Sequence, residues 1–139
     1  MVTQPFIDTN ILLYAGSNAA ADGPKKRIAS ALVAELDFCL SSQVVQEYLS
    51  NAVGKKALGI TMTQIEAVLE SLQEVTVQPV SYPLILEAWK IRNAYRISQW
   101  DATIIAAAQS LGCEILYSED MSDGQNYGGV RVVNPFKAR

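Results

Sequence analysis

The chain has 139 residues, of which half are apolar and 18% are charged, so it is long enough to bury one sizeable core. It contains no histidine, which excludes histidine-based acid–base catalysis, and any bound metal would be a hard cation held by oxygen atoms. The net charge of −3 does not attract polyanions, so a nucleic-acid partner would need a local basic patch or a bound cation.

The sequence shows no feature of a membrane or secreted protein. No apolar run approaches the roughly 18 residues of a membrane span, and Met1–Pro5 lacks the basic segment of a signal peptide. Cys39 and Cys113 lack metal-ligand spacing, so we expect buried thiols in a reducing compartment. We therefore expect one cytoplasmic domain over residues 1–139, with no membrane partner.

The N-terminal part of the chain opens on a short apolar run that ends in an acid. Phe6–Ile7 is expected to close a buried strand. A helix should follow over residues 11–15, with Asp8 or Thr9 as its cap.

The next elements are a helix, a strand and a helix. The first helix starts near Pro24, and its apolar stripe consists of Ile28, Leu32 and Leu36. A strand over residues 38–40 precedes a helix from Ser42 to about Val53. The apolar stripe of that helix consists of Val45, Leu49 and Ala52. Glu47 lies about 160° away from this stripe on a helical wheel, which is typical of a solvated face.

The C-terminal half repeats the alternation of helices and strands. In order, it comprises a helix opened by a Thr61–Gln64 capping box, a strand over 75–77, a helix over 84–95, a helix capped by Ser98, and strands over 114–117 and 130–133. This order predicts an α/β fold: a three-layer sandwich with a mostly parallel central sheet of four to five strands and helices on both faces.

Four carboxylates stand at positions that suit a site. Asp8 and Asp120 each follow a strand, at the edge of an open α/β sheet where ligands bind. Each of the four also has a purely structural interpretation: Asp8 as a helix cap, Asp101 as a helix-dipole partner, Asp120 as a turn residue and Glu47 as a solvated residue.

Carboxylates that cluster repel one another and raise each other's pKa. A divalent cation removes that conflict, so a cluster of acids without histidine favours Mg²⁺ or Mn²⁺. Such a metal commonly serves phosphoryl transfer, with water as the attacking group.

Four motifs resemble those of PIN-domain nucleases, in the same order and over nearly the whole chain. They are Phe-Ile-Asp-Thr-Asn-Ile-Leu-Leu-Tyr at 6–14, Val-Gln-Glu-Tyr at 45–48, Trp-Asp-Ala-Thr-Ile-Ile-Ala-Ala-Ala at 100–108 and Leu-Tyr-Ser-Glu-Asp-Met at 116–121. The closing segment Gly-Val-Arg-Val-Val-Asn-Pro-Phe is similar to the last strand of many members.

The compact length resembles the toxin of VapBC-type toxin–antitoxin pairs. The resemblance implies a Mg²⁺- or Mn²⁺-dependent endoribonuclease that acts on RNA, is often a homodimer and is inhibited by a small antitoxin. Matched by motif, the catalytic and metal-binding acids would be Asp8, Glu47, Asp101 and Asp120. Thr9 and Ser118 would hydrogen-bond metal ligands or waters, Asp123 would be a loosely matched outer acid, and Asn10 would stabilise the turn.

Other functions stay open at this stage. They are an RNA-processing nuclease of the same family without an antitoxin, a binding module that has lost its chemistry, and an aspartyl-phosphate phosphatase. The phosphatase requires a second Asp two residues after the first, where this chain has Asn10.

Contacts to the RNA backbone are the remaining expectation. Of the basic clusters we expect Lys90, Arg92 and Arg96 to provide them, with a merely solvated face as the alternative. Glu119 is expected to be solvated, and Trp100 to pack in the core rather than to stack on a base.

Overall fold

The computed structural model describes residues 3–137. The expected domain, residues 1–139, therefore extends past the described residues at both ends. Met1 and Val2, on which the absence of a signal peptide was argued, also lie outside them. Among residues 3–137, no helix combines the length and the apolar character needed to cross a bilayer.

Short strands form one central sheet within the described residues. They are β1 (Phe6–Ile7), β2 (Cys39–Ser41), β3 (Thr76–Gln78), β4 (Ile115–Tyr117), β5 (Asn126–Tyr127) and β6 (Val130–Val133). Their order is β3-β2-β1-β4-β6-β5, and every neighbouring pair is parallel except β5 and β6. The predicted fold class is confirmed, with six strands instead of four to five, because β5 lies in a glycine-rich segment too short to show periodicity.

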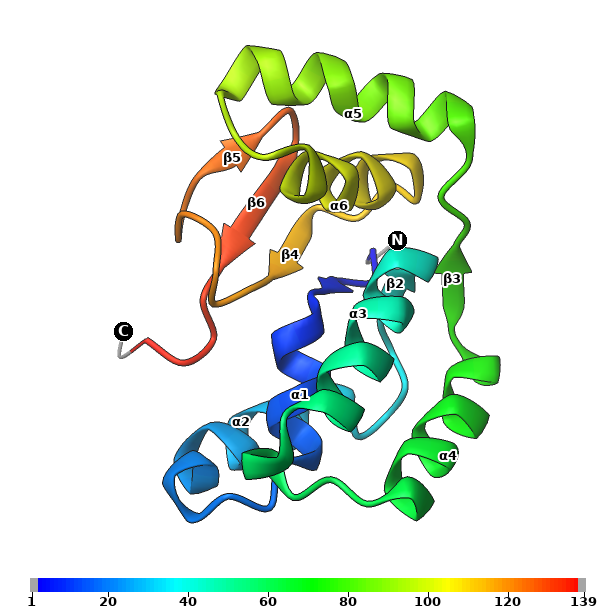
Figure 1. The fold of residues 1–139 in the computed structure, drawn as a ribbon. Coiled ribbons are helices and arrows are strands. Elements are labelled where there is room, and N and C mark those ends of the chain that lie inside the picture. Colours follow the sequence, from blue (N-terminus) through cyan, green and yellow to red (C-terminus); the bar gives the residue numbers. More distant parts are fainter. Residues whose placement is uncertain (1–2, 138–139) are drawn as a thin grey trace.

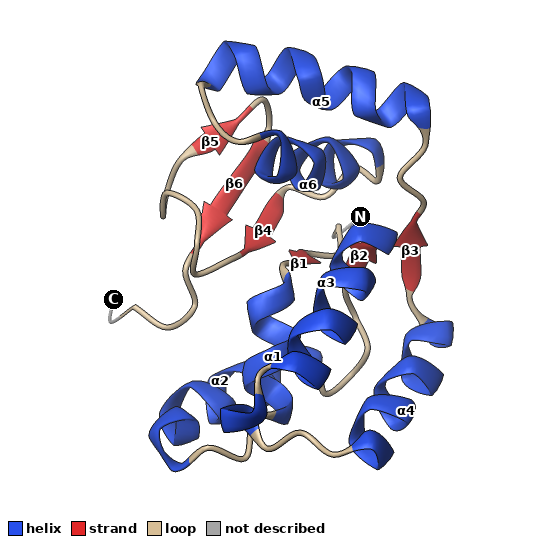
Figure 2. Ribbon diagram, in the orientation of Figure 1, coloured by secondary structure: helices blue, strands red, loops and turns tan. Residues whose placement is uncertain are grey.

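Helices alternate with these strands and cover the sheet (Figures 1 and 2). They are α1 (Thr9–Gly16), α2 (Gly23–Val33), α3 (Ser42–Gly54), α4 (Met62–Ser71), α5 (Tyr82–Tyr95) and α6 (Gln99–Ser110), with short 3-10 turns at Ala20–Asp22, Lys56–Leu58 and Leu72–Glu74. Figure 1 shows α5 packed along α6 at one end of the molecule, while α1 lies against α2 at the other.

Side-chain caps begin several of these helices, as predicted. The Asp8 carboxylate accepts from the Thr9 backbone N–H at 2.7 Å, which makes it the cap of α1. Thr61 and Gln64 form the expected capping box of α4, and the Ser98 hydroxyl caps α6. Each cap satisfies N–H groups that have no partner within the helix.

The apolar stripe predicted for α2 is wrong in two places. Leu36 lies beyond the end of the helix, in a left-handed conformation (φ 54°). Ile28 is 38% exposed, whereas the small Ala29 beside it is fully buried. α2 therefore packs through a small side chain, which a search for large apolar residues does not detect.

The face that α3 buries also differs from the prediction. Its buried residues are Val44, Tyr48 and Ala52, whereas Val45 and Leu49 are only partly buried. At 3.6 residues per turn, Glu47 lies about 100° from the centre of this face. Glu47 is thus at the flank of the buried face and not opposite it, where the predicted stripe had put it.

Candidate active site

The sheet reverses its direction of growth next to β1. From β1 the chain adds β2 and β3 on one side and then places β4 on the other, so β1 and β4 are neighbours. In an open parallel sheet such a reversal leaves a crevice at the carboxyl ends of the two strands. Asp8 follows β1 and Ser118–Asp120 follows β4, so both segments enter this crevice, where the Asp8 N–H donates to the Tyr117 carbonyl at 3.0 Å.

Asp8 is buried at the bottom of the crevice. Its Oδ1 accepts from the Thr9 N–H, and its Oδ2 accepts from the Ser118 hydroxyl at 2.7 Å. Burial raises the pKa of this carboxyl to about 6, opposed by the two hydrogen bonds and aided by the charges of Asp120 and Glu47. Asp8 is therefore both the cap of α1 and a carboxylate whose ionisation is costly.

Asn10 connects α1 to the loop that follows β4. Its Nδ2 donates to Asp120 Oδ2 at 3.0 Å, and its Oδ1 accepts from the Glu119 N–H at 3.3 Å. The expectation that Asn10 stabilises its own turn is wrong, because it holds a loop more than 100 residues away. An amide can make both contacts at once, since it has a donor and an acceptor.

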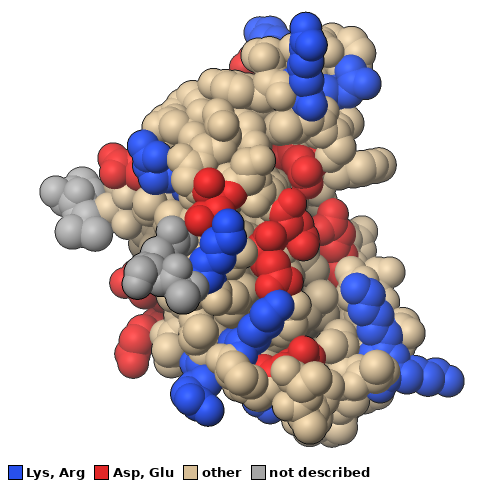
Figure 3. All heavy atoms as spheres, turned by 90° about the vertical axis from the view of Figure 1, so that its left-hand side faces the viewer, with Lys and Arg blue, Asp and Glu red and all other residues tan. Residues whose placement is uncertain are grey.

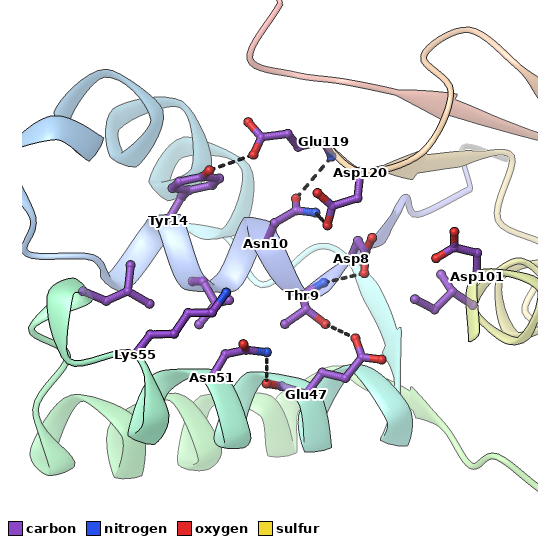
Figure 4. A pocket seen from close by; sticks show the side chains of 13 residues that line it. Asp8, Thr9, Asn10, Tyr14, Glu47, Asn51, Lys55, Asp101, Glu119 and Asp120 are labelled. Atoms are coloured by element: carbon purple, nitrogen blue, oxygen red, sulfur yellow. Dashed lines mark hydrogen bonds between the residues drawn. The ribbon is translucent and has the colours of Figure 1, made fainter. Parts of the chain in front are cut away.

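Glu47 approaches the crevice from α3. Its Oε2 accepts from the Thr9 hydroxyl at 2.9 Å, and its Oε1 accepts from Gln43 Nε2 at 3.0 Å. The residue is partly buried, so its interpretation as part of a freely solvated face is wrong. Figure 4 shows the bond to Thr9, with the Glu47 carboxylate on the same side of α3 as Asp8.

Asp101 comes from the first turn of α6, where the Ser98 hydroxyl accepts from its backbone N–H at 3.0 Å. Partial burial raises the pKa of its carboxyl, and the charges of Asp120 and Glu47 add to that shift. The carboxylate of Asp101 on α6 thus interacts electrostatically with acids of α3 and of the loop after β4.

These acids line one cavity of about 270 Å³. Its wall includes all four predicted acids and Glu119, and the complete lining is Asp8, Thr9, Asn10, Leu13, Tyr14, Glu47, Asn51, Lys55, Leu58, Asp101, Ile104, Glu119 and Asp120. Figure 3 shows acidic atoms gathered on one face of the molecule, and Figure 4 shows the labelled side chains projecting into the same space.

Residues 6–122 match the sequence model of the PIN domain. This chain belongs to the PIN-domain family. No curated protein matches the chain in a sequence search.

Solved structures with the same fold include three of toxins or toxin–antitoxin complexes. The VapC20 toxin of Mycobacterium tuberculosis, described as cleaving the sarcin–ricin loop, is 23% identical, with a TM-score of 0.61 over 84% of this chain and 90% of that one. A toxin–antitoxin complex from Klebsiella pneumoniae is 22% identical (TM-score 0.66; 98% and 100% covered). The DNA-bound VapBC of Salmonella typhimurium is 15% identical (TM-score 0.64; 94% and 97% covered).

Three further predictions about this PIN domain concern side chains near the acids. Thr9 and Ser118 do hydrogen-bond two of the acids, Glu47 and Asp8. Asp123 is not part of the cavity wall; its Oδ1 accepts from the Asn134 N–H at 2.8 Å, and the Lys137 ammonium lies 3.9 Å from its Oδ2.

Glu119 is the acid that the sequence analysis missed. It lines the cavity, accepts from the Tyr14 hydroxyl at 2.7 Å and pairs with Lys25. The Lys25 ammonium also lies 4.8 Å from the centre of the Tyr14 ring. The sequence held a partial indication of this contact. Asn10 and Tyr14 are four residues apart, so they share the face of α1 that contacts Glu119.

The basic side chain in the cavity wall is not one of the group expected to contact RNA, and that expectation stays a prediction. Among the described residues that line the cavity, Lys55 alone is cationic, whereas Lys90, Arg92 and Arg96 do not line it. They belong to α5 and its C-terminal cap, and α5 packs along α6. Trp100 is 71% exposed, so the expectation that it packs in the core is wrong.

The acids of the cavity suit a hard divalent cation, because they offer carboxylate oxygens and two of them, Asp8 and Asp101, have raised pKa values next to other acids. As the side chains stand, no three acids or cysteines within residues 3–137 are arranged to ligate one ion. In charge and chemistry the residues fit Mg²⁺ or Mn²⁺, and a rearrangement of side chains would have to complete the ligand set.

Proposed function

We propose that this PIN domain is a Mg²⁺- or Mn²⁺-dependent endoribonuclease that hydrolyses RNA phosphodiester bonds. The observation that carries the proposal is the meeting of Asp8, Glu47, Asp101 and Asp120, from four separate segments, in one cavity at the reversal point of the sheet. We take residues 1–139 to act as a single nuclease domain.

Asp8, Asp101 and Asp120 would hold the metal directly or through water, and Glu47 would bind it or orient the attacking water. When bound, the ion lowers the pKa of water and neutralises charge that develops on the phosphate. Asp8 is held in place by Ser118 and by the Thr9 N–H, so its orientation does not depend on the metal.

Glu47 is suited to take the proton of the attacking water. Thr9 and Gln43 each occupy one of its oxygens, which leaves a second lone pair on each oxygen. The lining hydroxyls of Thr9 and Tyr14 donate to Glu47 and Glu119, but a carboxylate is too weak a base to turn either hydroxyl into a strong nucleophile. We therefore take water as the attacking group.

The structural neighbours support the biological role. One of them is described as a toxin that cleaves the sarcin–ricin loop, and others are toxin–antitoxin complexes. We infer that this chain is likewise the toxin of a type II pair, that it forms a homodimer in the cytoplasm, and that a small antitoxin protein covers the acidic cavity.

Induction of the wild type and Asp8→Asn side by side, followed by mapping of cleaved cellular RNAs, tests the activity. We expect new RNA ends with the wild type only, and we expect the purified enzyme to lose cleavage in EDTA and regain it with Mg²⁺ or Mn²⁺. Full activity of Asp8→Asn in the presence of metal contradicts the assignment. A short reading frame of antitoxin size upstream of the gene would support the toxin role over an RNA-processing role.

A further inference from the structure

A second hollow, of about 570 Å³, adjoins the acidic cavity, and Glu47 lines both. Its walls come from α3, from the segment before α5, and from α5 and α6. The lining residues are Ser42, Gln43, Gln46, Glu47, Val80, Ile85, Gln99, Trp100 and Thr103. Apart from Glu47 the lining carries no charge, so a ligand there would be largely apolar and would reach the candidate active site directly.

Two buried amide oxygens in this wall have no hydrogen-bond partner among the described residues: Gln43 Oε1 and Gln99 Oε1. Gln43 Nε2 donates to Glu47 Oε1 at 3.0 Å and to the Trp100 carbonyl at 3.2 Å. Both of these partners only accept, so the orientation of the Gln43 amide is determined and its oxygen is left free. A buried acceptor without a donor is unfavourable, so a ligand with N–H groups is favoured if one of these amides turns its oxygen toward the hollow.

Trp100 supplies a flat surface at the same hollow. Its side chain is 71% exposed, although its neighbour Asp101 is partly buried in the acidic cavity. An exposed indole next to a carboxylate site is a platform on which a planar ring can stack. A ligand for this hollow therefore has flat apolar faces and N–H donors at its edge.

We propose that the hollow binds one unpaired base of the RNA, next to the phosphodiester that is cleaved. The base stacks on Trp100, and its amino or ring N–H donates to the oxygen of Gln43 or Gln99 once that amide has turned toward the hollow. A phosphate would bring only acceptors, and an aliphatic side chain would bring no donor. The inference rests on the proposed nuclease function and narrows its substrate to RNA that is single-stranded at this position.

Fluorescence tests the stacking directly, because the chain has two tryptophans. Trp89→Phe leaves Trp100 as the reporter, and Trp100→Phe leaves Trp89. Trp89 is 53% exposed but lines neither hollow, which makes it a matched control. Each protein is mixed with a short single-stranded RNA of mixed sequence, and separately with an abasic oligomer of the same length, in a stopped-flow instrument before cleavage occurs.

We expect RNA to quench Trp100 and the abasic oligomer to leave it unchanged, with no response from Trp89. Equal quenching by both oligomers, or no quenching of Trp100, overturns the proposal. Quenching that depends on protein concentration and not on RNA also overturns it, because the hollow would then be a contact between two copies of the chain.

Cleavage kinetics separate this inference from the proposed function. Trp100→Ala is expected to raise KM for single-stranded RNA about tenfold, with a smaller change in kcat, and Trp100→Tyr is expected to restore most of the loss. Gln99→Met should raise KM in the same direction, and Trp89→Ala should leave it unchanged. If the wild type cleaves RNA but Trp100→Ala has the same KM as Trp89→Ala, the proposed base site is wrong. If the wild type cleaves no RNA in the presence of metal, the proposed function itself is wrong.

Discussion

Ser118 Oγ donates a hydrogen bond of 2.7 Å to Oδ2 of Asp8, a residue 110 positions earlier in the chain. Both residues are buried, and they follow the neighbouring strands β4 and β1. The same hydroxyl oxygen accepts from the Asp120 N–H at 3.2 Å. One serine thus orients the acid after β1 and the backbone of the acid after β4.

Removal of this hydroxyl should lower the stability of the fold and raise the pKa of Asp8. For Ser118→Ala we expect the free energy of unfolding at neutral pH to fall by about 1.5–3 kcal/mol, since a hydrogen bond to a buried charge is lost. The pKa of Asp8 should rise above its value of about 6, because Ser118 lowers it. Urea denaturation in EDTA measures the first effect.

Ser110→Ala is the matched control, because the Ser110 hydroxyl donates only to a helix carbonyl, Ala107 O, at 2.9 Å. An equal loss of stability in the two variants would contradict the special role of the Ser118 contact.

Asp8→Asn should abolish metal binding while it preserves the fold. The Asn oxygen can still accept from the Thr9 N–H, and its amide can donate to the Ser118 hydroxyl. We expect calorimetry to detect Mn²⁺ binding to the wild type and to Glu66→Gln, an exposed acid on α4, but not to Asp8→Asn. Unchanged Mn²⁺ affinity of Asp8→Asn would remove Asp8 from the ligand set.

Stability without metal should depend on pH through Asp8. Its pKa is 3.8 in the unfolded chain and about 6 in the fold, so the protonated form is the one that folding favours. The stabilisation is therefore complete below about pH 3.8 and is lost as the pH rises through about 6. A shift of roughly two pKa units corresponds to about 3 kcal/mol.

Urea denaturation in EDTA between about pH 4 and pH 7 tests the direction of this pH dependence. The wild type should lose stability relative to Asp8→Asn across that window, by up to about 3 kcal/mol. Asp101 shifts in the same direction in both proteins, so the difference between them isolates Asp8. Parallel curves for the two proteins would show that Asp8 ionises normally.

Lys55 should contribute to RNA binding more than the basic group of α5. Its side chain lines the acidic cavity, whereas Lys90 does not. For Lys55→Gln we expect weaker RNA binding and a salt dependence reduced by about 0.7 in the log–log slope, as for one lost phosphate contact on a single strand. Lys90→Gln serves as the control, and a larger effect from Lys90→Gln would restore the original expectation for α5.

Part of the site could be read from local patterns. Asp8 and Asp120 follow strands, and a parallel sheet brings such positions to one edge. Asp101 follows a serine cap at a fixed spacing of three residues, so its place in the first turn of α6 was predictable. These features depend on interactions within a few residues or on the order of the elements, and both are present in the sequence.

Glu47 shows where such patterns fail. The apolar residues of α3 are spread around much of the helix, so periodicity alone placed the buried face on Val45 and Leu49. Packing instead buries Val44 and Tyr48, which turns Glu47 toward Thr9. The rotation of a helix about its own axis is chosen by its neighbours, and no local interaction specifies it.

The amino-acid order of this PIN domain was thus sufficient for its helix caps, its mostly parallel sheet, the absence of histidine from its acidic cavity and its family. Only the tertiary structure revealed that Asn10 bridges to Asp120, that Glu119 pairs with Lys25 at the cavity, and that Trp100 is exposed. The physical reason is the range of the interactions: caps arise within short segments, and parallel pairing follows from the alternation of helices and strands. The contacts of Asn10 and Glu119 form only after the ends of β1 and β4 have come together.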